Sequence, residues 1–225
     1  VLYELPPAYP NMARQILKTT SRQEPASGLV DGKEVVFDLM RQGFLSAAMI
    51  ETSYNLTLTA NWTNTDPIGL TLFSEILIRN GNSTLYTQSD AYCIARTQVS
   101  AVAKAAALYR LALPMNATTY APSVASVSGL VSYTYIHAPF FEYNDPKMMF
   151  NLKYFESLQV AATFNTAKRM GVKTGSEVKD ASCKLYTWIT SFDSATEKKI
   201  IANVSRNPTQ PMQMLCMNSI KEIKT

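Results

Sequence analysis

Side chains that could carry enzyme chemistry are sparse, and His137 is the single histidine among 225 residues. A histidine that acts as a general base needs an orienting partner, and no Gly-x-Ser-x-Gly motif provides a nucleophile for it. One histidine also cannot form a histidine-rich metal site. We therefore expect no catalytic residue and no metal site.

The cysteines Cys93, Cys183 and Cys216 lie far apart in the sequence. Zinc sites and disulfide frameworks place cysteines at short, regular spacings. Free cysteine is among the residue types most often buried. The three side chains are therefore predicted to be buried, reduced thiols.

Glu142 and Asp145 lie close together in an aromatic segment, as a pair of glycosidase carboxylates would. Nothing in the sequence fixes their separation or their pKa values, and solvated loop acids are the commoner case. The eight glycines form no phosphate-binding loop of the Walker or dinucleotide type. We expect no cofactor.

Aromatic residues gather between Tyr133 and Tyr154. Two interpretations stay open: a platform on which sugar rings stack, or the core or subunit interface of a β-sandwich, where aromatic residues are enriched. The members of this run are Tyr133, Tyr135, Phe140, Phe141, Tyr143, Phe150, Tyr154 and Phe155.

Composition narrows the class of protein. Hydrophobic residues make up 47% and charged residues 17% of the chain, against about 25% charged in an ordinary domain, which excludes a disordered tail or a charged coiled coil. The net charge is +4 with scattered Lys and Arg, so no specific nucleic-acid partner is expected.

Residues 111–141 carry no charged side chain, but three prolines interrupt them and no membrane span is expected. Glycosylation sequons begin at Asn55, Asn61, Asn82, Asn116 and Asn203.

Hydrophobic periodicity predicts a mainly antiparallel β protein. Apolar and polar residues alternate strictly over 50–60, which indicates a half-buried strand. Asn80-Gly81 between two strand-like runs predicts a hairpin. Helices are expected over 11–18 (capped by Asn11), over 91–110 and, after a capping box at 194–197, over 195–204. Further strands are expected over 35–39, 70–79, 83–87, 129–137, 149–154, 156–164, 183–192 and 212–223.

Three segments resemble those of a known family and follow one another in the same order as in that family. They are LFSEILIRNGNSTLY at 72–86, APFF at 138–141 with MFNLKYFESLQVAATF at 149–164, and LYTWITSFDSATEKK at 185–199. Together they resemble the double jelly-roll major capsid proteins of icosahedral DNA viruses and tailless phages. The first is similar to the family's strand, glycine hairpin, strand and helix, with Asn80-Gly81 where the family often has Gly-Gly. The second resembles the close of the first jelly roll, and the third the opening of the second.

The resemblance implies a structural virion protein. Its copies would form homotrimers that tile an icosahedral shell, in contact with neighbouring capsomers, penton and minor capsid proteins, and in some viruses over an internal membrane. Such proteins have no catalytic residues. An N-terminal arm would reach a neighbour or the layer beneath, where Arg14, Lys18 and Arg22 could face anionic lipid. The alternative function is a carbohydrate-binding or adhesin-type β-sandwich that uses the run Tyr133 to Tyr154.

The expected domains are an N-terminal arm (1–29), a first jelly roll (30–167), a linker (168–181) and the start of a second jelly roll or a C-terminal extension (182–225). A full double jelly roll needs more residues than this. A fragment, an abbreviated second domain and a single jelly roll with an extension all stay open.

Overall fold

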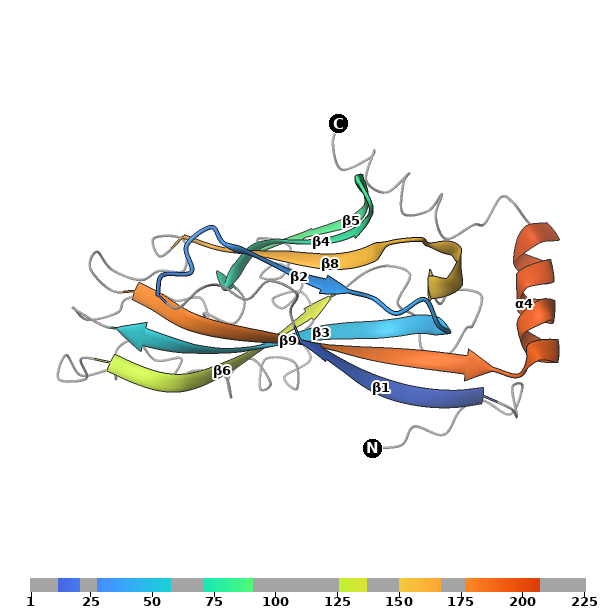
Figure 1. Ribbon diagram of the computed structural model, residues 1–225, viewed down its shortest axis with the longest axis horizontal. Helices are drawn as coiled ribbons and strands as arrows, with labels where there is room; N and C mark the ends of the chain where they lie inside the picture. The colour runs from blue at the N-terminus through green and yellow to red at the C-terminus, as the bar shows by residue number, and fades with distance from the viewer. Residues whose placement is uncertain are drawn as a thin grey trace, which may run out of the picture.

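The computed structural model describes residues 12–20, 28–57, 71–90, 126–136, 150–166 and 177–206. These segments form two antiparallel sheets that pack face to face, with a helix at one end (Figure 1). The helix expected over 91–110 and the strand expected over 212–223 lie outside the described residues.

Sheet A, the lower layer in Figure 1, has the strand order β1-β9-β3-β6. Its strands are β1 (Met12–Thr20), β3 (Phe44–Thr57), β6 (Ser126–Ile136) and β9 (Glu177–Phe192). The two-residue strand β7 (Phe150–Asn151) also pairs with β3 and leads into the short 3-10 helix η1 (Leu152–Tyr154). Sheet B has the order β2-β8-β4-β5, formed by β2 (Glu34–Asp38), β4 (Phe73–Asn80), β5 (Ser83–Ser89) and β8 (Leu158–Phe164).

The strands pair in a nested order. β1 pairs with β9, β2 with β8, β3 with β6 and β4 with β5, all antiparallel. Additional pairing of β3 with β9 and of β4 with β8 joins these four pairs into the two sheets. Eight antiparallel strands in two such sheets form a jelly roll, so the expected jelly-roll sandwich is confirmed.

The alternation expected in β3 places one row of side chains in the core. Ile50, Tyr54 and Leu56 are buried there, and Thr52 lies in the same row. Because successive side chains of a strand point to opposite faces, the residues between them lie on the outer face. The facing sheet B contributes Val35, Phe37, Ile76, Ile78, Val160 and Phe164 to the same core.

Two segments expected outside the first roll belong to sheet A. The helix expected over 11–18 is wrong, because this segment is strand β1 and pairs with β9 along its whole length. The spacing of the apolar residues Met12, Ile16 and Leu17 is compatible with a helix and also with an edge strand. The pairing with the distant strand β9 decides which of the two forms. β9 crosses the boundary at 181 between the expected linker and the expected second roll without a break in its pairing to β3, apart from bulges.

The hairpin between β4 and β5 is confirmed. Asn80 pairs with Ser83, so the turn residues are Gly81 and Asn82, one position later than the expected Asn80-Gly81. Gly81 has φ +56°, a conformation that glycine adopts without a steric penalty.

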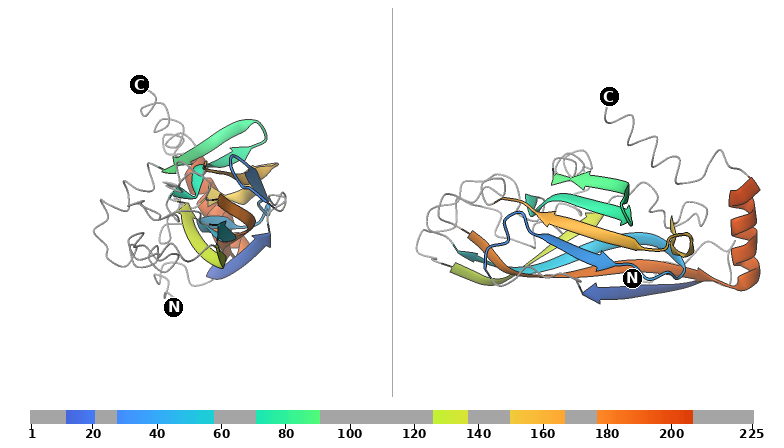
Figure 2. Two further views of the ribbon diagram at one scale, coloured as in Figure 1. Left: turned by 90° about the vertical axis from the view of Figure 1, so that its left-hand side faces the viewer. Right: turned by 45° about the horizontal axis from the view of Figure 1, so that its top comes forward.

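Helix α4 (Ser194–Arg206) stands across one end of the sandwich (Figure 2). Ile200 packs with Phe44 and Phe192 there. The capping box expected at 194–197 is wrong, because the Asp193 carboxylate accepts hydrogen bonds from the N–H groups of Ala195 and Thr196 at 3.0 and 2.9 Å. The Glu197 side chain instead forms an ion pair with Lys153.

Gly43 allows β3 to begin against β9. It has φ +71°, and a Cβ atom placed on it would lie 2.7 Å from Ile189 Cγ2 and 2.8 Å from the Thr190 carbonyl oxygen. The Gly43 carbonyl also accepts a hydrogen bond from the Leu152 N–H, which holds η1 against the start of β3. This position therefore requires glycine for two reasons, the backbone conformation and the space.

Candidate assembly surface

The outer face of sheet A carries large aromatic side chains. We call this surface the tyrosine face and define it by Met49, Tyr133, Tyr135, Tyr186 and Trp188, all half-buried, with the charged pair of Glu51 and Lys184 in its centre. Strand register arranges them in rows: Met49 lies opposite both Tyr135 and Tyr186, and Glu51 lies opposite both Tyr133 and Lys184. Side chains in such rows contact each other across strands.

An ion pair neutralises the centre of the tyrosine face. Lys184 Nζ lies 3.1 Å from Glu51 Oε1. The hydrogen bond to Glu51, and then its negative charge, raise the pKa of Lys184. Partial removal from water and the Glu51 carboxylate raise the pKa of the Tyr186 hydroxyl. Tyr186 is therefore uncharged at neutral pH, and the two charges at the centre compensate each other.

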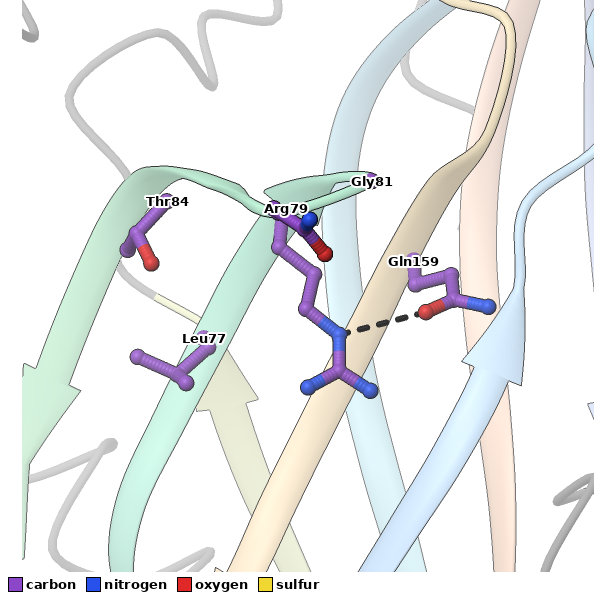
Figure 3. Close-up of a pocket in the computed structure, with 6 residues that line it drawn as sticks. Leu77, Arg79, Gly81, Thr84 and Gln159 are labelled. Carbon is purple, nitrogen blue, oxygen red and sulfur yellow. Dashed lines mark hydrogen bonds between the residues drawn. The ribbon is translucent and has the colours of Figure 1, made fainter.

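The outer face of sheet B is polar. Gln159 connects two charged side chains, since its amide donates to Asp38 at 2.7 Å and its oxygen accepts from Arg79 Nε at 3.1 Å. Arg79 also forms an ion pair with Glu34 at 3.3 Å. We call these four side chains the charged ladder, because they connect β4, β8 and β2. Figure 3 shows the hydrogen bond between Arg79 and Gln159.

A shallow open pocket of about 520 Å³ lies beside the charged ladder. It is lined by Leu77, Arg79, Gly81, Asn82, Thr84 and Gln159, so it contains one guanidinium and several neutral polar groups (Figure 3). None of the described residues that line it is aromatic. These residues therefore offer no flat ring on which a sugar could stack.

Asn55 connects two β-bulges at one end of sheet A. Its amide oxygen accepts a hydrogen bond from the Gly129 N–H in β6 at 3.0 Å, and its amide nitrogen donates to Asp180 in β9 at 3.2 Å. Asp180 also accepts from the Gly28 N–H at 2.7 Å. Gly129 and Asp180 both have positive φ, at the places where strand pairing to β3 shifts by a residue. The sequon at Asn55 is thus engaged in the fold, whereas Asn82 is exposed in the β4–β5 turn.

This connection predicts a pH dependence. The hydrogen bond from Gly28 and then that from Asn55 lower the pKa of Asp180. A carboxyl group whose pKa is lower in the folded chain stabilises the fold above its unfolded pKa of about 4, and this contribution is lost as the pH falls through the folded pKa. We expect Asp180→Asn to lower the melting temperature at pH 7 and to flatten its decline between about pH 5 and pH 2.

Thermal melts of the wild type and Asp180→Asn across this pH range measure the effect. Asn tolerates positive φ nearly as well as Asp, so the substitution mainly removes the charge. Glu156→Gln removes an exposed carboxylate before β8 and serves as the matched control. Identical pH profiles for wild type and Asp180→Asn would contradict the assignment.

The aromatic run from Tyr133 to Tyr154 does not form one platform in the described residues. Tyr133 and Tyr135 lie on the tyrosine face, whereas the buried rings of Phe150 and Phe155 stack 4.5 Å apart in the core. Tyr154 is 53% exposed in η1. Phe140, Phe141 and Tyr143 lie outside the described residues. The fold therefore divides this run between the core and an outer surface.

The other residues considered for chemistry are placed as follows. Cys183 is buried in sheet A and forms no disulfide with the other described residues, and Thr52 Oγ1 lies 3.5 Å from its sulfur. His137, Glu142, Asp145, Cys93 and Cys216 lie outside the described residues. Within the described ranges, no three His, Cys, Asp or Glu side chains approach closely enough to bind a metal ion. In the same ranges, no helix has the length and apolar character needed to cross a membrane.

Sequence reasoning identified Tyr133 and Tyr135 but missed the rest of the tyrosine face. Met49, Tyr186 and Trp188 belong to strands whose alternation is visible in the sequence. Alternation separates the two faces of a strand without indicating which strands are neighbours. The missing information was the pairing of β3 with both β6 and β9.

Comparison with known proteins gives a clear result for the fold. No family model and no curated protein matches the sequence. Among solved structures, the chain is similar to a protein of the PBCV-1 virus capsid, with a TM-score of 0.58 at 14% identity, over 88% of this chain and 47% of that one. It is also similar to the Faustovirus major capsid protein, with a TM-score of 0.59 at 10% identity, over 91% of this chain and 58% of that one.

The chain has the jelly-roll fold of these capsid proteins. It spans about half the length of the capsid chains that it matches. The expected resemblance to jelly-roll major capsid proteins is thereby confirmed at the level of the fold.

Proposed function

We propose that this chain is a structural virion protein, a major capsid protein whose copies build an icosahedral shell. The observation that carries the proposal is the nested pairing of eight strands in two sheets, an arrangement that aligns with the two viral capsid proteins over most of this chain. The proposed location is the capsid of the virion, and the proposed role is structural and not catalytic.

One complete jelly roll extends, in this proposal, from β1 to β9. The first roll then includes β1 from the expected arm (1–29) and β9 from the expected linker (168–181) and second roll (182–225). The match covers 47% and 58% of the two capsid chains, which leaves room in them for a second roll. This supports a correspondence between the present chain and a single roll of a double jelly-roll protein.

The proposed partners are other copies of the chain, as homotrimers and in neighbouring capsomers, together with penton and minor capsid proteins. Contact with an internal viral membrane through the N-terminal arm belongs to the same proposal. Lys18, on the exposed side of β1, is the basic side chain of that arm whose surroundings the structure describes.

The native mass of the purified chain tests the proposal. We expect light scattering after size exclusion to give about 75 kDa, three times the 25.0 kDa of one chain, or larger closed assemblies. Negative-stain images of the same peak should show particles with a roughly hexagonal outline. A mass of 25.0 kDa at every concentration up to about 100 µM would contradict self-assembly.

A further inference from the structure

We propose that the tyrosine face of sheet A is the surface through which one copy of this chain binds another. The inference rests on the proposed capsid function and specifies which face of the roll makes the contact. It commits to a second copy of the chain as the occupant.

The composition of the tyrosine face is that of an interface. Tyrosine, tryptophan and methionine are enriched in the centres of protein interfaces, and charged residues are depleted there. Four of the five defining side chains are aromatic, and the fifth is Met49. Ile16 in the neighbouring edge strand β1 lies opposite Trp188 and is 59% exposed, so an apolar side chain continues the surface at the edge of the sheet. Lys18 lies on the same side of β1, opposite Tyr186, and places one basic side chain at this edge.

The charges of the tyrosine face permit its burial. Burying an ion without its partner is strongly unfavourable, whereas a pair that is already formed keeps its compensation. Glu51 and Lys184 form such a pair within one chain, 3.1 Å apart. The outer face of sheet B differs, because it carries the ion pair of Glu34 with Arg79 together with the carboxylates of Asp38 and Glu75, and so has more charged groups than the tyrosine face. Charged residues are depleted in the centres of protein interfaces.

The outer face of sheet A as a whole, which includes the tyrosine face, is large enough for a stable interface. Four strands of about 9 to 16 residues, spaced about 4.8 Å apart with a rise of about 3.3 Å per residue, span on the order of 800 Å². A standard stable interface covers about 800 Å² on each partner. One copy seated on this face would therefore cover the area that a specific complex needs.

A matched pair of substitutions tests the proposal. Met49→Lys places a charge at the centre of the tyrosine face, in the middle of the row formed with Tyr135 and Tyr186. Leu77→Lys places the same charge on the outer face of sheet B, where Leu77 is also half-buried in an interior strand of its sheet. Lysine can extend its charged end into water in each monomer, so both variants should fold.

Sedimentation velocity over a dilution series of the full chain measures self-association. We expect Met49→Lys to raise the dissociation constant at least about 30-fold, as the loss of a central contact does, and Leu77→Lys to change it less than about threefold. Equal association of wild type and Met49→Lys would overturn the proposed face and leave the capsid function intact. A wild-type chain that stays monomeric would overturn the capsid function together with the face.

Tryptophan fluorescence gives a second readout that does not depend on a disruptive variant. The chain has two tryptophans, so Trp62→Phe leaves Trp188 as the single reporter. We expect its emission to shift to shorter wavelength over the same concentrations at which the chain associates, because association removes the indole from water. Emission that stays constant while the chain associates would show that the copies meet elsewhere, or that a segment of the same chain covers the face, and either result overturns the proposal.

Discussion

Gly43→Ala is expected to destabilise the folded chain by about 3 kcal/mol or more, which would lower its melting temperature by about 10 °C. The added methyl group would lie 2.8 Å from the Thr190 carbonyl oxygen, which belongs to the backbone of β9 and cannot rotate away. Alanine at φ +71° adds a conformational cost of about 1 kcal/mol. Since β3 lies between β9 and β6, a shift of its start would disturb the centre of sheet A.

Gly32→Ala separates the two causes. Gly32 has φ +66°, but no atom lies within 4 Å of the position that its Cβ would occupy. This variant should therefore lose only about 1 kcal/mol, the conformational cost alone. Chemical denaturation of the wild type and both variants measures the three free energies of unfolding. Equal losses of unfolding free energy in the two variants would mean that the backbone of β9 at Thr190 moves away from the added methyl group without a measurable loss of stability.

Phe164→Ala is expected to lower the free energy of unfolding by about 3–5 kcal/mol. The ring of Phe164 is fully buried at the end of β8, with its centroid 4.8 Å from that of Phe73. Removal of the ring leaves a cavity between two strands whose backbones stay in place, because β8 is paired on both sides with β2 and β4. The loss combines the transfer of the ring to water with the cost of this cavity.

Tyr154→Ala is the matched control for Phe164→Ala. It removes an aromatic ring of similar size that is 53% exposed, so its cost should stay within about 0.5 kcal/mol. Urea denaturation with an unchanged slope would assign the difference to the folded state. A loss of more than about 2 kcal/mol in Tyr154→Ala would contradict its exposed placement in η1.

The sequence predicted those parts of the fold whose signal is local. Strict alternation over 50–60 predicted β3, since one face of that strand is buried in the core. Asn80-Gly81 predicted the hairpin because its turn needs a residue that accepts positive φ, and Gly81 has it. Both signals lie within a dozen residues of the chain, and neither depends on a distant partner.

The elements that were missed depend on distant partners. β1 carries apolar residues that suit a helix or a strand, and its pairing with β9 decides between them. The start of β9, from Glu177 to Ala181, follows a segment rich in Lys and Gly and was interpreted as linker. Asp180 holds a positive φ there, which interrupts the alternation that would otherwise mark a strand.

The candidate surface was predictable only in part, for a related reason. Tyr133 and Tyr135 lie two residues apart in the strand expected over 129–137, so alternation places them on one face, and the structure shows them on the same face. Which side faces the core follows from Ser132, Thr134 and Ile136, whose small or branched side chains fill the space toward sheet B. Composition alone would have placed the tyrosines inside and the serine and threonine outside.

The nested order of the strands also governs how the chain can fold as it is synthesised. Met12 pairs with Phe192, 180 positions later in the sequence. At about 5–20 residues per second, β1 waits roughly 10–40 s on the ribosome before its partner exists. Until then β3 lacks its neighbour β9, and its unpaired edge is open to other chains. Such long-range pairing predicts slow folding, and a nascent chain that benefits from a chaperone until β9 has been synthesised.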